Sequence, residues 1–250
     1  METLHHLWSP APKDLILADN EVHVWRAQLE LPSSQVQRLR GILTEDELDR
    51  ANRFSFEIDR QRFIAARGIL RSILSRYITI EPSHLRFNYN QYGKPLLAPE
   101  FSSNLLNFNL SHSGSMALYA ITRNMEIGID VERVCSDFEY EEIAKCFFSV
   151  DEVAMLHTIP TEKKLEAFYH CWIRKEAYVK AHGKGLSLPL DSLDVSFAPG
   201  EPPILLITKD KPQERFLWTL LDLKPSLGHM GALAVKGIGC RFRYWDWNEL

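Results

Sequence analysis

A short segment, residues 127–132, carries the residues best suited to chemistry. Its apolar residues alternate with Asp130 and Glu132, so as a β-strand it places both carboxylates on one face. Two carboxylates on a stiff strand suit Mg²⁺, which takes one or two carboxylates and completes its shell with water and substrate phosphates. The segment favours a metal site for phosphate chemistry. For this segment alone, the alternative is an edge strand with a solvated polar face.

A second acidic group lies in residues 164–180, whose apolar residues follow the period of a long helix. Glu176 and Lys180 are one turn apart along the flank of its apolar stripe, so the acid and the ammonium face the same place. The alternative is a surface ion pair, worth roughly 0.3 kcal/mol. Their position beside Trp172, at the border of the buried stripe, argues against that reading. A third carboxylate near the acidic strand would complete a metal site or serve as a base.

Several cationic and polar groups precede the acidic strand. Lys94 stands between a glycine and a proline in a turn, which could present its ammonium to a phosphate. Ser111 and His112 end a strand and could donate hydrogen bonds to phosphate oxygens. They are not a nucleophile and its base, because adjacent strand residues point to opposite faces. The helical segment 59–77 carries five arginines, which are either a solvated surface or include one or two that reach an anionic ligand. These are Arg60, Arg62, Arg67, Arg71 and Arg76.

The elements that must position these groups follow from periodicity. Residues 116–121 predict an apolar strand, and the turn after it predicts a β-hairpin with the acidic strand. That hairpin would bring Ser111 and His112 close to the carboxylates. Thr44 and Glu47 form a capping-box pattern that opens a helix. The other expected helices are 33–43, 140–148 and 151–156, and the other expected strands are 21–27, 85–89, 106–110, 195–197, 204–208, 216–223, 232–235 and 241–245.

Composition excludes several classes. The chain has 250 residues, of which 45% are hydrophobic and 25% charged, as in an ordinary globular protein of one large or two small domains. A net charge of −4 offers no general attraction for nucleic acid. The four cysteines include no Cys-x-x-Cys pair, which fits free thiols in a reducing compartment. No apolar run reaches the length of a membrane span and no signal-peptide pattern opens the chain, so a cytoplasmic location is expected.

Four motifs in this order resemble those of the 4'-phosphopantetheinyl transferases, of the type that activates surfactin synthetase. They are Tyr92-Gly93-Lys94-Pro95, Phe108 to Ser113, Ile127 to Glu132, and Trp172 to Ala181 with Gly183-Lys184-Gly185-Leu186. The resemblance implies an α+β fold of two similar halves, 1–124 and 125–250, related by a pseudo-twofold axis. It also implies a monomer with coenzyme A in the cleft between the halves.

The reaction implied by the resemblance is attack by a serine hydroxyl of an apo acyl or peptidyl carrier protein on the β-phosphorus of coenzyme A. Phosphopantetheine moves to the serine and 3',5'-ADP leaves. Asp130 and Glu132 would hold Mg²⁺, and Glu176 would complete the metal site and act as base. A metal-bound water assisted by Glu132 is the other possible base. Lys180 would stabilise or protonate the departing phosphate.

The resemblance further implies that Lys94, Ser111 and His112 contact the coenzyme's phosphates, and that Arg53 and Arg67 reach its nucleotide end. Two other functions use the same residues: a metal-dependent hydrolase of coenzyme A or a nucleotide, and a non-catalytic binder of carrier proteins. A hydrolase would release ADP without a carrier protein, and a binder would tolerate Glu176→Gln. The sequence leaves open which carriers and which biosynthetic pathway are served.

Overall fold

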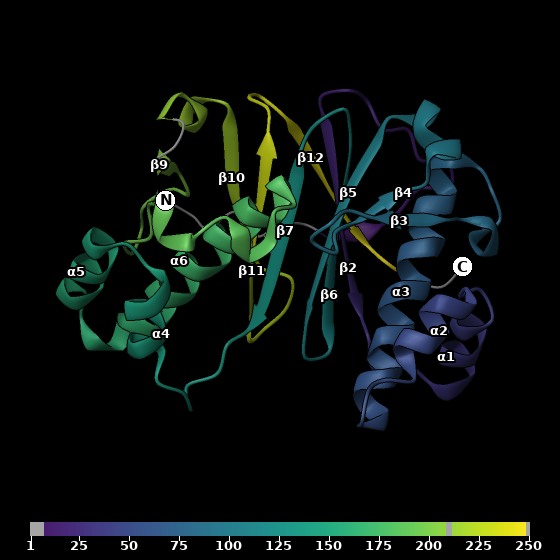
Figure 1. Cartoon of the computed structure of the whole chain (residues 1–250), viewed down its shortest axis with the longest axis horizontal. Helices are drawn as coiled ribbons and strands as arrows, with labels where there is room; N and C mark the ends of the chain where they lie inside the picture. The colour runs from purple at the N-terminus through teal and green to yellow at the C-terminus, as the bar shows by residue number, and fades with distance from the viewer. Residues whose placement is uncertain (1–7, 209–211, 249–250) are drawn as a thin grey trace.

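Two β-sheets lie back to back between two long helices in the computed structural model, which describes residues 8–208 and 212–248 (Figure 1). The order across the molecule is helix α3, a five-stranded sheet, a three-stranded sheet and helix α6. This mixed arrangement confirms the α+β fold expected from the sequence. Within the described part of the chain, no helix is long and apolar enough to cross a membrane.

The first half packs three helices on the outer face of the five-stranded sheet, whose strand order is β1-β12-β2-β6-β5. The apolar side of α3 drives this packing, because Ile69, Leu70, Ile73 and Leu74 are fully buried against the sheet. Its elements are β1 (Ser9–Pro10), β2 (Glu21–Gln28), α1 (Ser33–Arg40), α2 (Glu45–Ala51), α3 (Glu57–Ile78), β3 (Phe87–Tyr89), β4 (Pro95–Leu97), β5 (Leu106–Ser113) and β6 (Met116–Arg123), joined by β12 (Arg241–Asp246) from the far end of the chain.

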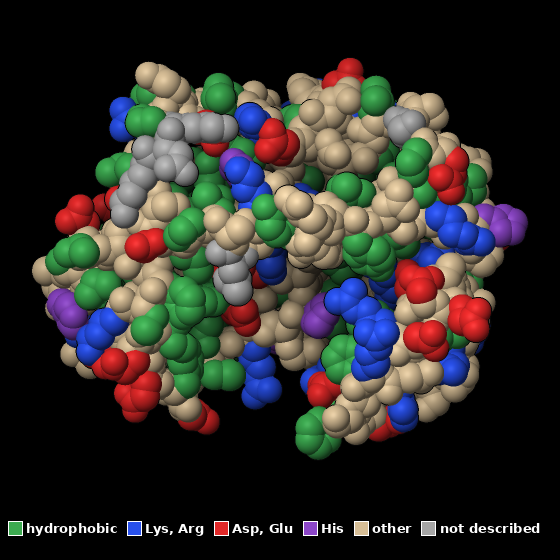
Figure 2. All heavy atoms as spheres, viewed as in Figure 1, with side chains coloured by type: hydrophobic (Ala, Val, Ile, Leu, Met, Phe, Trp, Pro, Cys, Tyr) green, Lys and Arg blue, Asp and Glu red, His purple; other side chains and the backbone are tan. Residues whose placement is uncertain are grey.

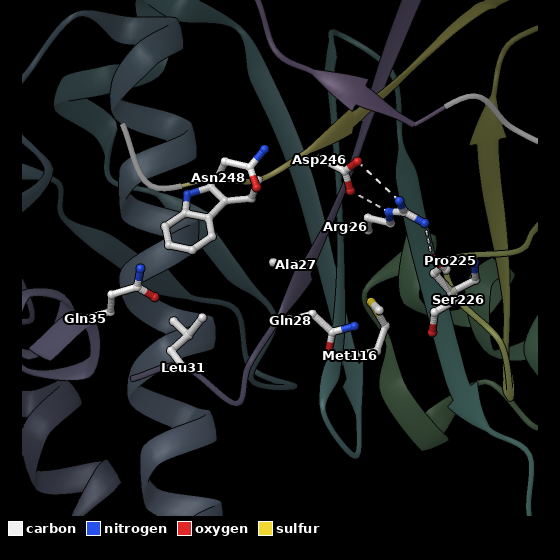
Figure 3. Close-up of a pocket in the computed structure, with 11 residues that line it drawn as sticks. Arg26, Ala27, Gln28, Leu31, Gln35, Met116, Pro225, Ser226, Asp246 and Asn248 are labelled. Atoms are coloured by element: carbon white, nitrogen blue, oxygen red, sulfur yellow. Dashed lines mark hydrogen bonds and ion pairs between the residues drawn. The ribbon is translucent and has the colours of Figure 1, made fainter. Parts of the chain in front are cut away.

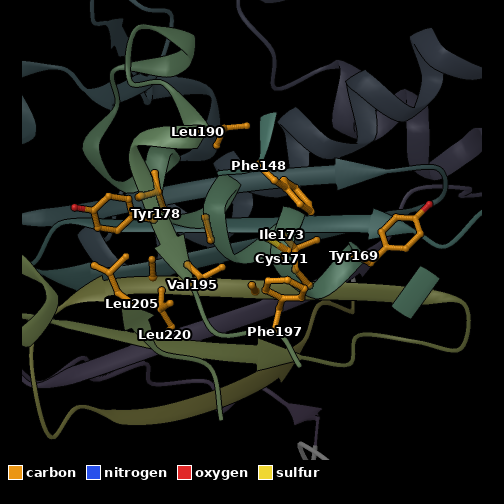
Figure 4. Packing of buried hydrophobic residues seen from close by; sticks show 14 of the residues in the cluster. Phe148, Tyr169, Cys171, Ile173, Tyr178, Leu190, Val195, Phe197, Leu205 and Leu220 are labelled. Carbon is orange, nitrogen blue, oxygen red and sulfur yellow. The ribbon is translucent and has the colours of Figure 1, made fainter. Parts of the chain in front are cut away.

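The second half packs α4, α5 and α6 on the outer face of the three-stranded sheet, whose order is β10-β11-β7. Figure 4 shows the resulting core, in which α6 side chains such as Ile173 and Tyr178 pack against Val195 and Leu220. Its elements are β7 (Ile127–Arg133), α4 (Tyr140–Phe147), α5 (Val150–Thr158), α6 (Thr161–His182), β8 (Leu193–Val195), β9 (Leu205–Thr208), β10 (Trp218–Leu223) and β11 (His229–Lys236).

The predicted helices and strands are found, although β8 overlaps the predicted strand 195–197 only at Val195, and one predicted pairing is wrong. The hairpin is formed by β5 and β6, whereas β7 pairs with β11 in the other sheet. The reason is that the apolar side chains of β6, before the turn, and of β7, after it, are buried against one another. Leu118 and Ala120 on β6 face Ile129 and Val131 on β7 across the core between the two sheets, so the two strands stack instead of pairing edge to edge. The carboxylates of β7 still lie beside β5, as the site shows below.

The order of elements repeats along the chain. The first half runs strand, two short helices, a 22-residue helix, two short strands and a hairpin, and the second half runs through the same series from β7 to β11. Strand order repeats too, since β2-β6-β5 has the pattern of β7-β11-β10.

A buried ion pair also repeats. Glu47 closes the capping box of α2 and binds Arg71 of α3, and Glu152 closes that of α5 and binds Lys175 of α6. Each cation also donates to two carbonyls in the segment after its long helix, which satisfies two more of its donors. These are Pro82 and Leu85 in the first half, and Leu190 and Leu193 in the second.

Helix α6 rests directly on the backbone of β7 at Gly128. A Cβ at this position would overlap the carbonyl oxygen of Ala177 and the amide nitrogen of Ala181, and would lie 2.9 Å from the Ala181 Cα. Only glycine therefore permits this approach. The approach brings the helix that carries Glu176 and Lys180 onto the strand that carries the two carboxylates.

We expect Gly128→Ala to lower the free energy of unfolding by about 3 kcal/mol, because the obstructing atoms are backbone and cannot rotate away. Urea unfolding followed by circular dichroism measures this loss. Gly41→Ala is the matched control, since its Cβ would meet little beyond the Arg38 carbonyl oxygen at 3.3 Å. Equal stability of the two variants would contradict the close approach.

Candidate active site between the two halves

The residues singled out from the sequence meet where the edge of β5 lies against β7 and α6. Lys180 Nζ donates to Asp130 Oδ1 at 2.5 Å and to Ser111 Oγ at 2.8 Å. Ser111 Oγ in turn donates to Asp130 Oδ1 at 3.0 Å. Figure 2 shows a hollow between the two halves at this level, with a histidine and Lys or Arg side chains on the side of α3.

Alternate side chains of β5 attach this strand to β7. Asn109 Oδ1 accepts from the Ile129 amide at 2.9 Å, and Ser113 Oγ donates to Glu132 Oε2 at 2.8 Å. Together with Ser111, they form a ladder of side chains on one face of the strand. Asn109 and Ser113 were not expected as site residues. Their spacing of two from Ser111 was the available signal.

The carboxylates of the site disfavour one another's charge. Burial, then the charge of Asp130, raises the pKa of Glu132, while hydrogen bonds from Ser113 and Trp172 oppose the shift. Burial and the charge of Asp130 also raise the pKa of Glu176, with Lys180 opposing and Glu132 adding to the shift. Such crowding of like charges calls for a cation.

A divalent metal fits part of this arrangement. Asp130 Oδ2 is buried and has no hydrogen-bond partner among the residues that the structure describes. Together with Glu132 on the same strand, it offers the one or two carboxylate ligands that Mg²⁺ requires. A complete site of three protein ligands is not formed: among residues 8–208 and 212–248, no group of three or more His, Cys, Asp or Glu side chains could hold a metal ion.

A cavity of about 270 Å³ opens next to this cluster, lined by Ser111, His112 and Lys180 on one side and by α2 and α3 on the other. Arg50 and Arg67 supply positive charge to it, and Phe63 and Tyr89 supply aromatic surface. No sequence pattern singles out Arg50, Phe63 or Tyr89, because each follows only the ordinary pattern of its element.

Charge in the cavity is unbalanced toward positive. Glu47 binds Arg67 at 2.6 Å and Arg71 at 2.7 Å, so one carboxylate faces two guanidinium groups. Arg67 is almost fully buried, stacks 4.4 Å from the Phe87 ring centre and donates to the Tyr89 hydroxyl. A rigid guanidinium with surplus positive charge suits a phosphate.

His112 lines the cavity and remains accessible to solvent. Burial, and then the charges of Lys180 and Arg62, lower the pKa of its imidazole. The lowered pKa favours the uncharged ring at neutral pH, in which one nitrogen can donate and the other can accept a hydrogen bond.

Two expected ligand contacts are placed differently. Lys94 Nζ donates to the carbonyl oxygens of Lys180 at 2.8 Å, Ala181 at 2.9 Å and Ile127 at 3.2 Å, so its donors point at the end of α6 and the start of β7. Burial there lowers the pKa of Lys94 to about 8. Among the described residues, Arg50 lines the cavity, whereas Arg53 is exposed in the turn after α2.

A second cavity, of about 390 Å³, lies beside β2 and the turn between β10 and β11 (Figure 3). Its charged groups neutralise each other, because Arg26 Nε donates to Asp246 Oδ1 at 2.5 Å and the same guanidinium donates to the Pro225 carbonyl. It contains none of the residues expected to act in catalysis. The cavity beside Lys180 is therefore the candidate site.

Comparison with known proteins bears on both halves. The family described as "4'-phosphopantetheinyl transferase, N-terminal" matches residues 28–124, and the "4'-phosphopantetheinyl transferase superfamily" matches residues 126–228. The 4'-phosphopantetheinyl transferase HetI of a Nostoc species is 42% identical over 98% of this chain and 100% of its own length.

Two further relatives match over shorter lengths. The 4'-phosphopantetheinyl transferase Sfp of Bacillus subtilis is 34% identical over 69% of this chain and 75% of its own. The human L-aminoadipate-semialdehyde dehydrogenase-phosphopantetheinyl transferase is 28% identical over 76% of this chain and 66% of its own. The chain belongs to the 4'-phosphopantetheinyl transferase family.

Proposed function

We propose that this enzyme moves the 4'-phosphopantetheine arm of coenzyme A to a serine of an apo acyl or peptidyl carrier protein and releases 3',5'-ADP. One observation carries the proposal. Lys180 lines a positively charged cavity and binds Asp130, and the charges of Asp130, Glu132 and Lys180 all act on Glu176. Phosphoryl transfer from an anionic coenzyme requires this combination of acids and cations.

The cavity would hold the nucleotide end of coenzyme A. Arg50 and Arg67 offer guanidinium groups to phosphate oxygens, and the neutral imidazole of His112 offers a hydrogen bond. Phe63 and Tyr89 offer apolar faces to the adenine ring. Arg53 lies three residues beyond Arg50 and is exposed in the turn after α2, and its contact with the nucleotide stays a prediction.

Asp130 and Glu132 would hold Mg²⁺, with Glu176 as a further ligand or as the base. When bound, Mg²⁺ neutralises charge on the pyrophosphate. Ser111 and Ser113 support this role by fixing one oxygen of each strand carboxylate through hydrogen bonds of 3.0 Å and 2.8 Å.

The protein's own groups account for the proton and the leaving group. The serine oxygen forms a bond to the β-phosphorus, and the bond from that phosphorus to the bridging oxygen of 3',5'-ADP breaks. Glu176 takes the serine proton, and its raised pKa makes it a stronger base than an ordinary glutamate. Lys180 faces the same cluster and stabilises the negative charge that builds on the departing phosphate.

We expect Glu176→Gln and Asp130→Asn each to lower the transfer rate by about 10²- to 10⁴-fold, because the base or a metal ligand is lost while shape is kept. Intact mass of an apo acyl carrier protein, incubated with coenzyme A and Mg²⁺, measures the transfer. Glu162→Gln, at an exposed position in the first turn of α6, is the control. ADP release without any carrier protein would instead indicate a hydrolase. Undiminished transfer by Glu176→Gln would exclude this base.

The crowded carboxylates also predict a pH effect on stability. Because the folded pKa of Glu176 is raised above 4.5, the metal-free folded state keeps a proton that the unfolded chain releases. The contribution of Glu176 to the free energy of unfolding therefore falls as pH rises from 4.5 through the folded pKa. We expect Glu176→Gln to gain stability relative to the parent as pH rises above 4.5 in EDTA, measured by urea unfolding. A difference that does not change with pH would contradict the shift.

A further inference from the structure

The turn between β3 and β4 belongs to the first half, but one of its side chains contacts helix α6 of the second half. Lys94 in this turn donates to three carbonyl oxygens: those of Lys180 and Ala181 at the end of α6, and that of Ile127 at the start of β7. An ammonium has three N–H donors, so all of them are used. The side chain joins the two elements that carry the candidate catalytic groups.

The turn is built to hold this position. Asn90 Oδ1 accepts from the amides of Tyr92 and Lys94, each at 2.9 Å, which shapes the turn. Asn90 Nδ2 donates to the Gly183 carbonyl at 2.7 Å. Gly183 ends α6 in the left-handed region, and a Cβ there would lie 2.8 Å from Lys94 Cδ.

A cation is favoured at the end of α6. The last carbonyls of a helix lack partners within the helix and carry the negative end of its dipole. The carbonyl of Lys180 already accepts from the Gly183 amide at 3.2 Å, and the ammonium of Lys94 adds a second, charged donor. This fixes the backbone of the residue whose side chain reaches Asp130 and Ser111.

We propose that Lys94 is a positioning residue, whose ammonium ties the end of α6 to the wall of the coenzyme cavity. Its neighbours Gly93 and Pro95 line that cavity, so the same turn touches both the binding space and the catalytic helix. The inference rests on the proposed function and assigns Lys94 a task other than contact with a phosphate. Loss of the tether displaces Lys180 and Glu176 without removing a group that binds coenzyme A.

Lys94→Met keeps most of the side-chain length and removes all three donors. We expect kcat for transfer to a carrier protein to fall by about 10²-fold, since displacement of a catalytic group by about 1 Å has that effect. The dissociation constant for coenzyme A with Mg²⁺, measured by calorimetry, should stay within about twofold, because no phosphate contact is lost. Lys163→Met, an exposed lysine in the first turn of α6, is the matched control.

Hydrogen exchange gives a readout that needs no catalysis. Amides of residues 179–183 should exchange about tenfold or more faster in Lys94→Met, while those near the start of α6 stay unchanged. Asn90→Ala weakens the same junction without changing any charge, and should lower kcat and speed exchange in the same direction. It replaces Lys94→Met if that variant does not fold.

The outcomes separate the alternatives. A weaker affinity for coenzyme A with unchanged kcat at saturation would overturn the proposal in favour of a phosphate contact. Unchanged exchange at the end of α6, or unchanged kcat, would also overturn it. If the parent protein transfers nothing, the proposed function fails, but exchange and coenzyme binding still report on the tether.

Discussion

The close contact between α6 and β7 sets the geometry of everything else in the site. At Gly128 the helix meets the strand backbone to backbone, with no side chain between them. The acids of β7 and the Glu176–Lys180 pair of α6 are therefore separated by distances that the main chain fixes. Densely packed backbone does not yield as a flexible side chain does, so the side chains of the candidate site are arranged before any ligand arrives.

The chain uses one scaffold twice and places its chemistry differently on each copy. In both halves, a buried glutamate caps a short helix and binds a cation on the long helix. A buried pair of this kind is stable only when further hydrogen bonds satisfy the cation, and in each half loop carbonyls accept two of its donors. The two long helices differ in the site residues that they carry: α3 contributes Arg67 to the lining of the cavity, whereas α6 carries Glu176 and Lys180.

Local pattern predicted the local structure well. The alternation in β7 correctly places Asp130 away from the apolar face, and the capping box at Thr44 opens α2. Local pattern does not predict which distant strands pair. Strand β7 pairs with β11, about a hundred residues later, because burial between the two sheets decides the pairing. Likewise, nothing near Lys94 indicates the helix end that it meets. Spacing suggested a metal site at Asp130 and Glu132 and a third carboxylate at Glu176, whereas the specific reaction and the individual role of each residue came from the family resemblance.

Strand β12 gives the molecule a property that neither half has alone. It comes from the end of the chain but lies between β1 and β2, parallel to both, in the sheet of the first half. A cut after residue 124, where the sequence suggests a division, would strip this strand from β2 and leave an open sheet edge. The two halves are therefore expected to melt in a single cooperative transition, and shortening the chain at its last strand should disorder the wall that carries the arginines of the cavity.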